Sequence, residues 1–163
     1  MSFKEEISKS LKCKIEPEVS LKFNLVRQVL EAIDENTLAD DFIINCDDQK
    51  ITIHFRHFID DNEIRIEIDK FEINVFVCGL PIYLSGSFEE DDEYVKNIQA
   101  YLKAILGGHY EIKKFIETNG RILKQVINFH NPVYKPKEFS GIRGLFHSFI
   151  KYDTYITEGS NYL

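Results

Sequence analysis

The sequence predicts an α+β fold: a mainly antiparallel, twisted sheet of about six or seven strands, covered by a long amphipathic helix. Two stretches predict the sheet. Apolar residues alternate with polar ones between Lys50 and Ser87, and Asn119-Gly120 stands between two runs of matched length. The segment from Phe88 to Leu106 has apolar residues at helical spacing. Because a sheet with one apolar face needs a cover, we expect this helix to lie on it, with the N-terminal helices packed at an edge or on the same side.

The chain begins with two predicted helices. Ser2 and Glu5 form a capping box ahead of apolar residues at helical spacing, which predicts a helix from Phe3 to about Lys12. A second helix is expected from about Leu21 to Asp34. Apolar residues also alternate from Val19 to Leu25, so a strand could begin there instead.

The predicted sheet follows an acidic loop. Phe42 to Cys46 is typical of a short buried strand, and Asp47-Asp48-Gln49 of a turn. Two alternating runs come next, with the apolar residues Ile51, Ile53, Phe55, Ile64, Ile66 and Ile68. The apolar series resumes three residues later, so either a bulge or a turn at Asp69-Lys70 must reset the register. A further hairpin is expected to turn at Gly79-Leu80-Pro81.

Boundary signals surround the predicted covering helix. Ser87 and Glu90 form a capping box before it, and Gly107-Gly108 supplies a left-handed cap after it. The Asn119-Gly120 sequence then predicts a hairpin with a two-residue turn. That turn would pair Thr118 with Arg121, Ile116 with Leu123, Ile112 with Ile127 and Tyr110 with Phe129.

The end of the chain gives weaker patterns. Phe146, Phe149 and Ile150 predict a short final helix, followed by a polar segment from Glu158 to Asn161. At 163 residues, the chain is expected to be a single α+β domain, 1–163, with a flexible tail from about residue 157. No apolar run approaches the length of a membrane span and no secretory signal begins the chain, so we expect a cytoplasmic protein.

Motifs for chemistry are absent. Cys13, Cys46 and Cys78 are far apart without a C-x-x-C pattern, which predicts buried free thiols rather than disulfides or a zinc site. His54 and His57 would point to opposite faces of one strand and could not share a metal unless the strand ended between them. No nucleophile or phosphate-loop motif occurs, so we expect no cofactor and no enzyme activity. Only tertiary folding could unite the remaining histidines, His109, His130 and His147.

Charge is the remaining feature. The net charge is −7, with 22 acidic against 11 basic residues in positions 1–100, and 5 against 9 after them. The acidic side chains expected in loops and at the helix start are Asp40, Asp41, Asp47, Asp48, Asp60, Asp61, Glu63, Glu89, Glu90, Asp91 and Asp92. Turns and helix starts favour such residues locally, but on one rim they would form a negative patch that suits a basic protein.

These observations predict a small, soluble, acidic binding protein that neutralises a basic protein partner. An immunity-protein-like inhibitor (antitoxin) of a toxin such as a nuclease is the example we favour. Nucleic acid is disfavoured as a partner because the chain is acidic. One alternative is a secretion or folding chaperone, in which sheet and helix offer apolar grooves to a client protein. Another is an enzyme whose site is assembled from distant residues.

Overall fold

The computed structural model describes residues 2–10, 12–34, 41–56, 63–83, 92–131, 137–140, 152–159 and 161–163. The described helices are α1 (Phe3–Ser10), α2 (Pro17–Leu30) and α3 (Asp92–Leu106). One sheet has the order β1-β2-β3-β4-β5, with β1 (Asp41–Cys46), β2 (Lys50–Arg56), β3 (Ile64–Asp69), β4 (Ile73–Val77) and β5 (Leu80–Tyr83). The other has the order β8-β7-β6-β9, with β6 (Tyr110–Glu117), β7 (Ile122–Phe129), β8 (Lys137–Ser140) and β9 (Tyr152–Glu158).

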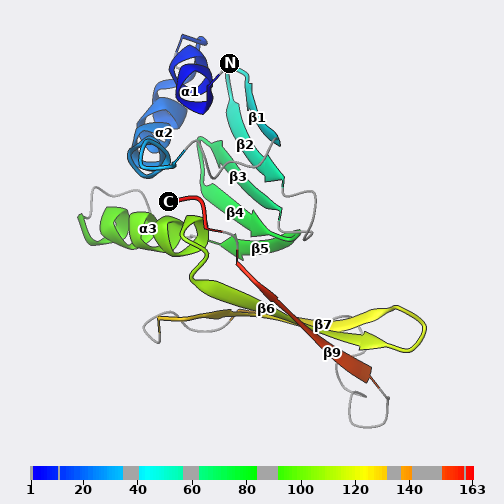
Figure 1. The fold of residues 1–163 in the computed structure, drawn as a ribbon. Helices are drawn as coiled ribbons and strands as arrows, with labels where there is room; N and C mark the ends of the chain where they lie inside the picture. The colour runs from blue at the N-terminus through cyan, green and yellow to red at the C-terminus, as the bar shows by residue number, and fades with distance from the viewer. Residues whose placement is uncertain are drawn as a thin grey trace.

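The α+β class is therefore confirmed, but the single sheet of six or seven strands is wrong. All described strand pairs are antiparallel and they form two separate sheets. In Figure 1 the second sheet extends away from the helices and the first sheet. The period-2 pattern predicted which face of each strand is buried, but such a pattern does not say which strand edges pair.

Both N-terminal helices form, with different boundaries. The capping box is confirmed: the Ser2 amide donates to Glu5 Oε2 at 2.9 Å, and the Glu5 amide donates to Ser2 Oγ at 3.2 Å. Helix α2 begins at Pro17, four residues before the predicted start, and ends at Leu30. Proline suits the first helical turn because its φ is already helical and its missing N–H would have no partner there. The alternative of a strand from Val19 is wrong.

The five-stranded sheet is a meander whose inner face is fully apolar. Alternate residues of β2, β3 and β4 are buried, as the pattern predicted. The register resets through a turn rather than a bulge, because Asp69 Oδ1 accepts from the amides of Phe71 at 2.7 Å and Glu72 at 2.9 Å. Phe71 is therefore 76% exposed in the turn and does not belong to the apolar face.

The next hairpin turns one residue earlier than predicted. Val77 pairs with Leu80, so the turn residues are Cys78 and Gly79, with φ of 50° and 76°. Positive φ at both central positions is the type I′ geometry that matches the twist of a two-residue hairpin.

Helices α1 and α2 cover the five-stranded sheet, a role that the sequence analysis gave to the helix from Phe88 to Leu106 (Figure 1). Helix α2 packs on β2 and β3 through Val19, Phe23 and Val26, which are buried. Helix α3 lies against α2, where Gln99 Nε2 donates to Gln28 Oε1 at 2.7 Å.

The described α3 has 15 residues, so the long helix is not found, and positions 84–91 lie outside the described residues. No helix among the described residues is long and apolar enough to span a membrane.

The hairpin of β6 and β7 is confirmed, with one correction to its register. Tyr110 pairs with Phe129 and Ile112 with Ile127, as predicted, but Ile116 pairs with Ile122 instead of Leu123. The predicted two-residue turn and its pair of Thr118 with Arg121 are also wrong: the turn holds three residues, since the Glu117 amide donates to the Arg121 carbonyl at 2.9 Å. This longer turn shifts the register by one residue, and the irregularity after Phe115 restores it.

The C-terminal part contains strands that the sequence did not predict. Strand β9 pairs with β6, and β8 with β7. Beyond β9, Tyr162 is buried and its amide donates to the Leu106 carbonyl at 2.6 Å, so the chain end packs against the core. The final helix predicted from Phe146, Phe149 and Ile150 falls outside the described residues.

Candidate functional site

The described acidic residues among those singled out in the sequence lie at both ends of the five-stranded sheet. Asp47 and Asp48 form the turn between β1 and β2, whereas Glu63 precedes β3 at the opposite end of the sheet. Strand β2 separates these two ends by roughly 20 Å, at about 3.3 Å per residue. Asp41 begins β1 beside the end of β2, and Asp92 begins α3. The others, Asp40, Asp60, Asp61, Glu89, Glu90 and Asp91, lie outside the described residues.

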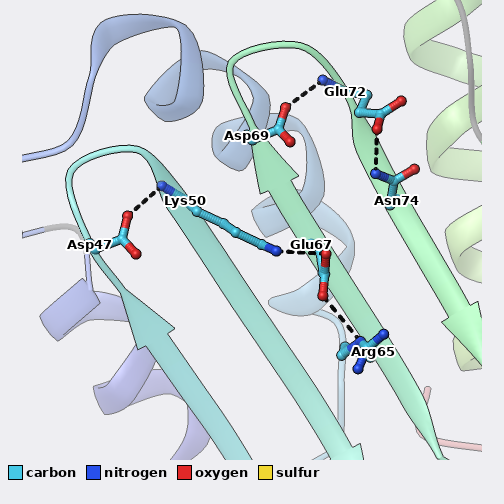
Figure 2. Close-up of polar contacts among 7 residues, drawn as sticks. All are labelled: Asp47, Lys50, Arg65, Glu67, Asp69, Glu72 and Asn74. Carbon is cyan, nitrogen blue, oxygen red and sulfur yellow. Dashed lines mark hydrogen bonds and ion pairs between the residues drawn. The ribbon is translucent and has the colours of Figure 1, made fainter.

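The fold instead gathers a different acidic group, which we call the acidic edge: Glu16, Glu18, Asp47, Asp48, Asp69 and Glu72. In a meander, the first and third turns fall at the same end, and Figure 2 shows the two turns side by side. The Glu16 amide donates to the Asp48 carbonyl at 2.9 Å, which brings the start of α2 to this end. The acidic residues singled out in the sequence did not include Glu16 and Glu18 at the start of α2, or Asp69 and Glu72 in the third turn. Because antiparallel strands alternate in direction, the first and third turns had to fall at the same end, so Asp69 and Glu72 could have been found.

Two aspartates of the acidic edge have a structural role. Asp47 Oδ1 accepts from the amides of Gln49 at 2.9 Å and Lys50 at 2.7 Å, and Asp69 Oδ1 closes its turn in the same way. Aspartate favours such turns because its carboxylate can accept from backbone N–H groups two and three residues on. The carboxylates are therefore held in fixed positions while their charge stays at the surface. Asp48 and Glu72 are exposed.

A buried lysine lies beneath the acidic edge. Lys22 of α2 is 2% exposed, and its Nζ donates to the Asp69 carbonyl at 3.0 Å. Burial lowers the pKa of this amine, while the carboxylates of Asp69, Glu72 and Glu18 oppose the shift. Lys22 thus offsets part of the acidic charge from the inside and links α2 to the turn between β3 and β4.

The outer face of the sheet continues from the acidic edge as an ion-pair network. Lys50 Nζ lies 2.7 Å from Glu67 Oε2, and Arg65 Nε lies 3.2 Å from Glu67 Oε1 (Figure 2). The Arg65 guanidinium also lies over the Phe76 ring, 4.3 Å from its centroid. Because two cations share one carboxylate, this network is not itself acidic. The acidic edge itself lies in two turns of the sheet and at the start of α2, with Lys70 in one of these turns.

Two of the dispersed histidines, His109 and His130, lie together, whereas His57 and His147 fall outside the described residues. The His130 amide donates to the His109 carbonyl at 2.9 Å, and both side chains line a hollow of about 550 Å³ with Lys103 and Asn131. No serine, threonine or cysteine is among the described lining residues, so that part of the lining holds no hydroxyl or thiol nucleophile. His54 pairs with Glu63 elsewhere, and no group of three or more potential metal ligands occurs in the described part of the chain.

Comparisons with protein-family models, with curated proteins and with solved structures found no match.

Proposed function

We propose that this protein is a binding protein that captures a basic protein partner through the acidic edge. The observation that carries the proposal is the meeting of three acidic segments, from the start of α2 and from two turns of the sheet, at one end of the molecule. Complementary charge steers association and selects among partners, so a basic surface is the counterpart that this end fits. Inhibition of a basic toxin, such as a nuclease, is the specific activity that we propose.

Preorganisation supports this proposal. Backbone amides fix Asp47 and Asp69, and the Asn74 Nδ2 donates to Glu72 Oε1 at 2.7 Å. Side chains that are ordered before binding lose little entropy when a partner arrives. The acidic edge can therefore present its charges to a partner without rearranging first.

The test uses a charge-matched pair of variants. Asp48→Asn with Glu72→Gln removes two charges from the acidic edge, and glutamine keeps an oxygen for Asn74. Glu117→Gln with Asp153→Asn removes two charges from the second sheet and serves as the control. The immobilised proteins are exposed to host lysate at low salt, and a retained basic partner is then purified for kinetics and for an assay of its own activity.

We expect the purified partner to associate more slowly with the acidic-edge variant than with the wild type, and the control variant to behave as the wild type. We also expect association with the wild type to slow as the salt concentration rises. Equal association rates for both variants would overturn the acidic edge as the binding surface. A partner that binds but keeps its activity would refute inhibition and leave binding intact.

A chaperone function is the second candidate, favoured by exposed apolar residues on the second sheet. Ile122 is 42% exposed, Tyr155 54% and Ile156 55%. Among the described strands, β9 lies at an edge of this sheet beside β6, and we propose that its backbone pairs with an extended client segment. Binding of a reduced, carboxymethylated model client should then survive high salt and fall in Tyr155→Ser with Ile156→Ser. Failure of this variant to weaken binding would refute the second candidate.

A further inference from the structure

Two cysteines far apart in the sequence meet beside the acidic edge. Cys13 is exposed in the connection between α1 and α2, and Cys46 is the partly buried last residue of β1. Their thiols form a hydrogen bond with each other. The bond from the Glu16 amide to the Asp48 carbonyl, 2.9 Å long, holds the same two segments together independently of the thiols.

The three thiols are free, as expected, but they are not buried: Cys13 is exposed, and Cys46 and Cys78 are partly buried. Cys13 is open to solvent, and the Cys46 thiol lies beside it. Cys78 lies in the turn between β4 and β5, at the opposite end of the five-stranded sheet. The chain therefore contains a thiol pair and a distant third thiol that can serve as an internal reference.

We propose that Cys13 and Cys46 form a reversible dithiol–disulfide site whose oxidant is a low-molecular-weight disulfide such as glutathione disulfide. The Cys13 thiolate attacks one sulfur of glutathione disulfide, forming a mixed disulfide and releasing one glutathione thiolate. The Cys46 thiolate then attacks the Cys13 sulfur and releases the second glutathione. The protein loses two electrons and two protons, and glutathione disulfide becomes two glutathione molecules.

Exposure sets the order of these steps. Cys13 can meet glutathione disulfide directly, whereas Cys46 is partly covered. Burial raises the pKa of the Cys46 thiol to about 12, and the hydrogen bond of this thiol with Cys13, the charge of Cys13 and the Asp47 carboxylate add to the rise. Few Cys46 thiols are ionised at neutral pH, so the second step is the slower one and contact with Cys13 makes it possible.

Oxidation would attach the connection between α1 and α2 to the turn that carries Asp47 and Asp48. The disulfide would close a chain loop that contains α2 and β1. Closing such a loop restricts the unfolded chain, so the oxidised protein should melt at a higher temperature than the reduced protein. This inference is independent of the proposed function.

The experiment incubates the full chain in glutathione buffers of increasing oxidising strength, followed by acid quenching, alkylation and peptide mass spectrometry. We expect a species lighter by two hydrogens, with a linked Cys13–Cys46 peptide, an alkylated Cys78 and full reversal by dithiothreitol. Cys78→Ser should behave as the wild type. Cys46→Ser should instead accumulate the mixed disulfide of Cys13 with glutathione.

Two results would overturn the proposal: a wild type that accumulates the mixed disulfide as Cys46→Ser does, or a linked peptide that contains Cys78. A measurement without mutation guards against misfolding of the variants. Phenylarsine oxide bridges two neighbouring thiols, so one equivalent should protect both Cys13 and Cys46 from alkylation and leave Cys78 reactive. Alkylation of Cys13 or Cys46 at the rate of Cys78 would argue against the pair.

Discussion

The Nζ of Lys22 in α2 donates to the carbonyl of Asp69, 3.0 Å away, at the turn between β3 and β4. This bond joins the covering helix to the sheet at the acidic edge, and the lysine that makes it is almost fully buried. A buried amine without partners would be unfavourable, but here a carbonyl and three nearby carboxylates surround it.

The first prediction concerns the stability that Lys22 supplies. Lys22→Ala should lower the free energy of unfolding by about 2 to 4 kcal/mol, because it leaves a cavity and an unpaired carbonyl. Lys22→Met fills the space without donating a hydrogen bond, so it should lower the free energy of unfolding by less. The exposed Lys9→Ala is the control and should change stability by within about 0.5 kcal/mol. Urea unfolding measures all three, and equal losses in Lys22→Ala and Lys9→Ala would contradict this role.

The second prediction is the pH dependence of that lysine. Burial lowers the pKa of Lys22 in the folded protein below the ordinary 10.5 of the unfolded chain. Between the two values the unfolded chain binds more protons, so raising the pH favours the folded state. The wild type should therefore gain unfolding free energy relative to Lys22→Met as the pH rises through this window to 10.5. A difference that stays constant or moves the other way would show that the folded pKa is not lowered.

The third prediction concerns a buried hydroxyl in the second sheet. Tyr110 is fully buried, and its hydroxyl has no hydrogen-bond partner among the described residues. Burial accordingly raises the pKa of its phenol. Because an unpaired buried hydroxyl is unfavourable, Tyr110→Phe should raise the free energy of unfolding by about 1 kcal/mol. Tyr155→Phe, at an exposed position, should change nothing measurable in the same denaturation experiment, and a clear loss in Tyr110→Phe would reveal a partner for the hydroxyl.

The first sheet was largely predictable because one of its faces is buried. That burial forces apolar residues onto every second position, so β2 to β4 could be read from Ile51 to Val77. Grouping the strands into sheets was not predictable in this way. The partner of an edge such as β9 is chosen by contacts distant in sequence, and its side chains from Asp153 to Ile156 are exposed on both faces, which removes the alternation.

The candidate site was predictable only in part. Asp47 and Asp48 were found through their turn, but charge alone grouped them with Asp60, Asp61 and Glu63, whereas strand direction groups them with Asp69. The contact between Cys13 and Cys46 had no sequence signal. It depends on how the connection after α1 lies beside the turn after β1, which no periodic pattern records.

The fourth prediction compares two glycines that are required for different reasons. At Gly159 an added Cβ would lie 2.6 Å from Tyr110 Cε1, so Gly159→Ala must displace a buried ring. At Gly79, with φ +76°, an added Cβ meets nothing within 4 Å, and only the backbone conformation is unfavourable. We expect losses of about 1 to 3 kcal/mol for Gly159→Ala from overpacking and about 1 to 2 kcal/mol for Gly79→Ala.

Replacing the ring that Gly159 faces separates these two causes. In a Tyr110→Leu background, Gly159→Ala should lower the free energy of unfolding by less, because the smaller side chain leaves room. Gly79→Ala should lower it by the same amount in both backgrounds. Thermal or urea unfolding of the single and double variants gives the coupling free energy between each glycine and Tyr110. An unchanged cost for Gly159→Ala would mean that the glycine is not required by contact with Tyr110.

The last prediction separates the structural role of the acidic edge from its charge. Asp47 closes its turn by accepting from two backbone amides, whereas Asp48 beside it is exposed. Asp47→Ala should therefore lower the free energy of unfolding by about 1 to 2 kcal/mol, since two turn hydrogen bonds are lost. Asp47→Asn keeps an oxygen in the same place and should lose much less, and Asp48→Asn should stay within about 0.5 kcal/mol.

The electrostatic effect should follow a different order from the stability effect. If the acidic edge attracts a basic partner, Asp47→Asn and Asp48→Asn should slow association by similar factors at low salt, although only Asp47→Ala is clearly destabilised. The difference between wild type and variants should shrink as ionic strength rises and screens the charges. Urea unfolding and stopped-flow association on the same preparations measure the two effects. Association rates that follow stability rather than charge would mean that the carboxylates at this end act only as turn-forming groups.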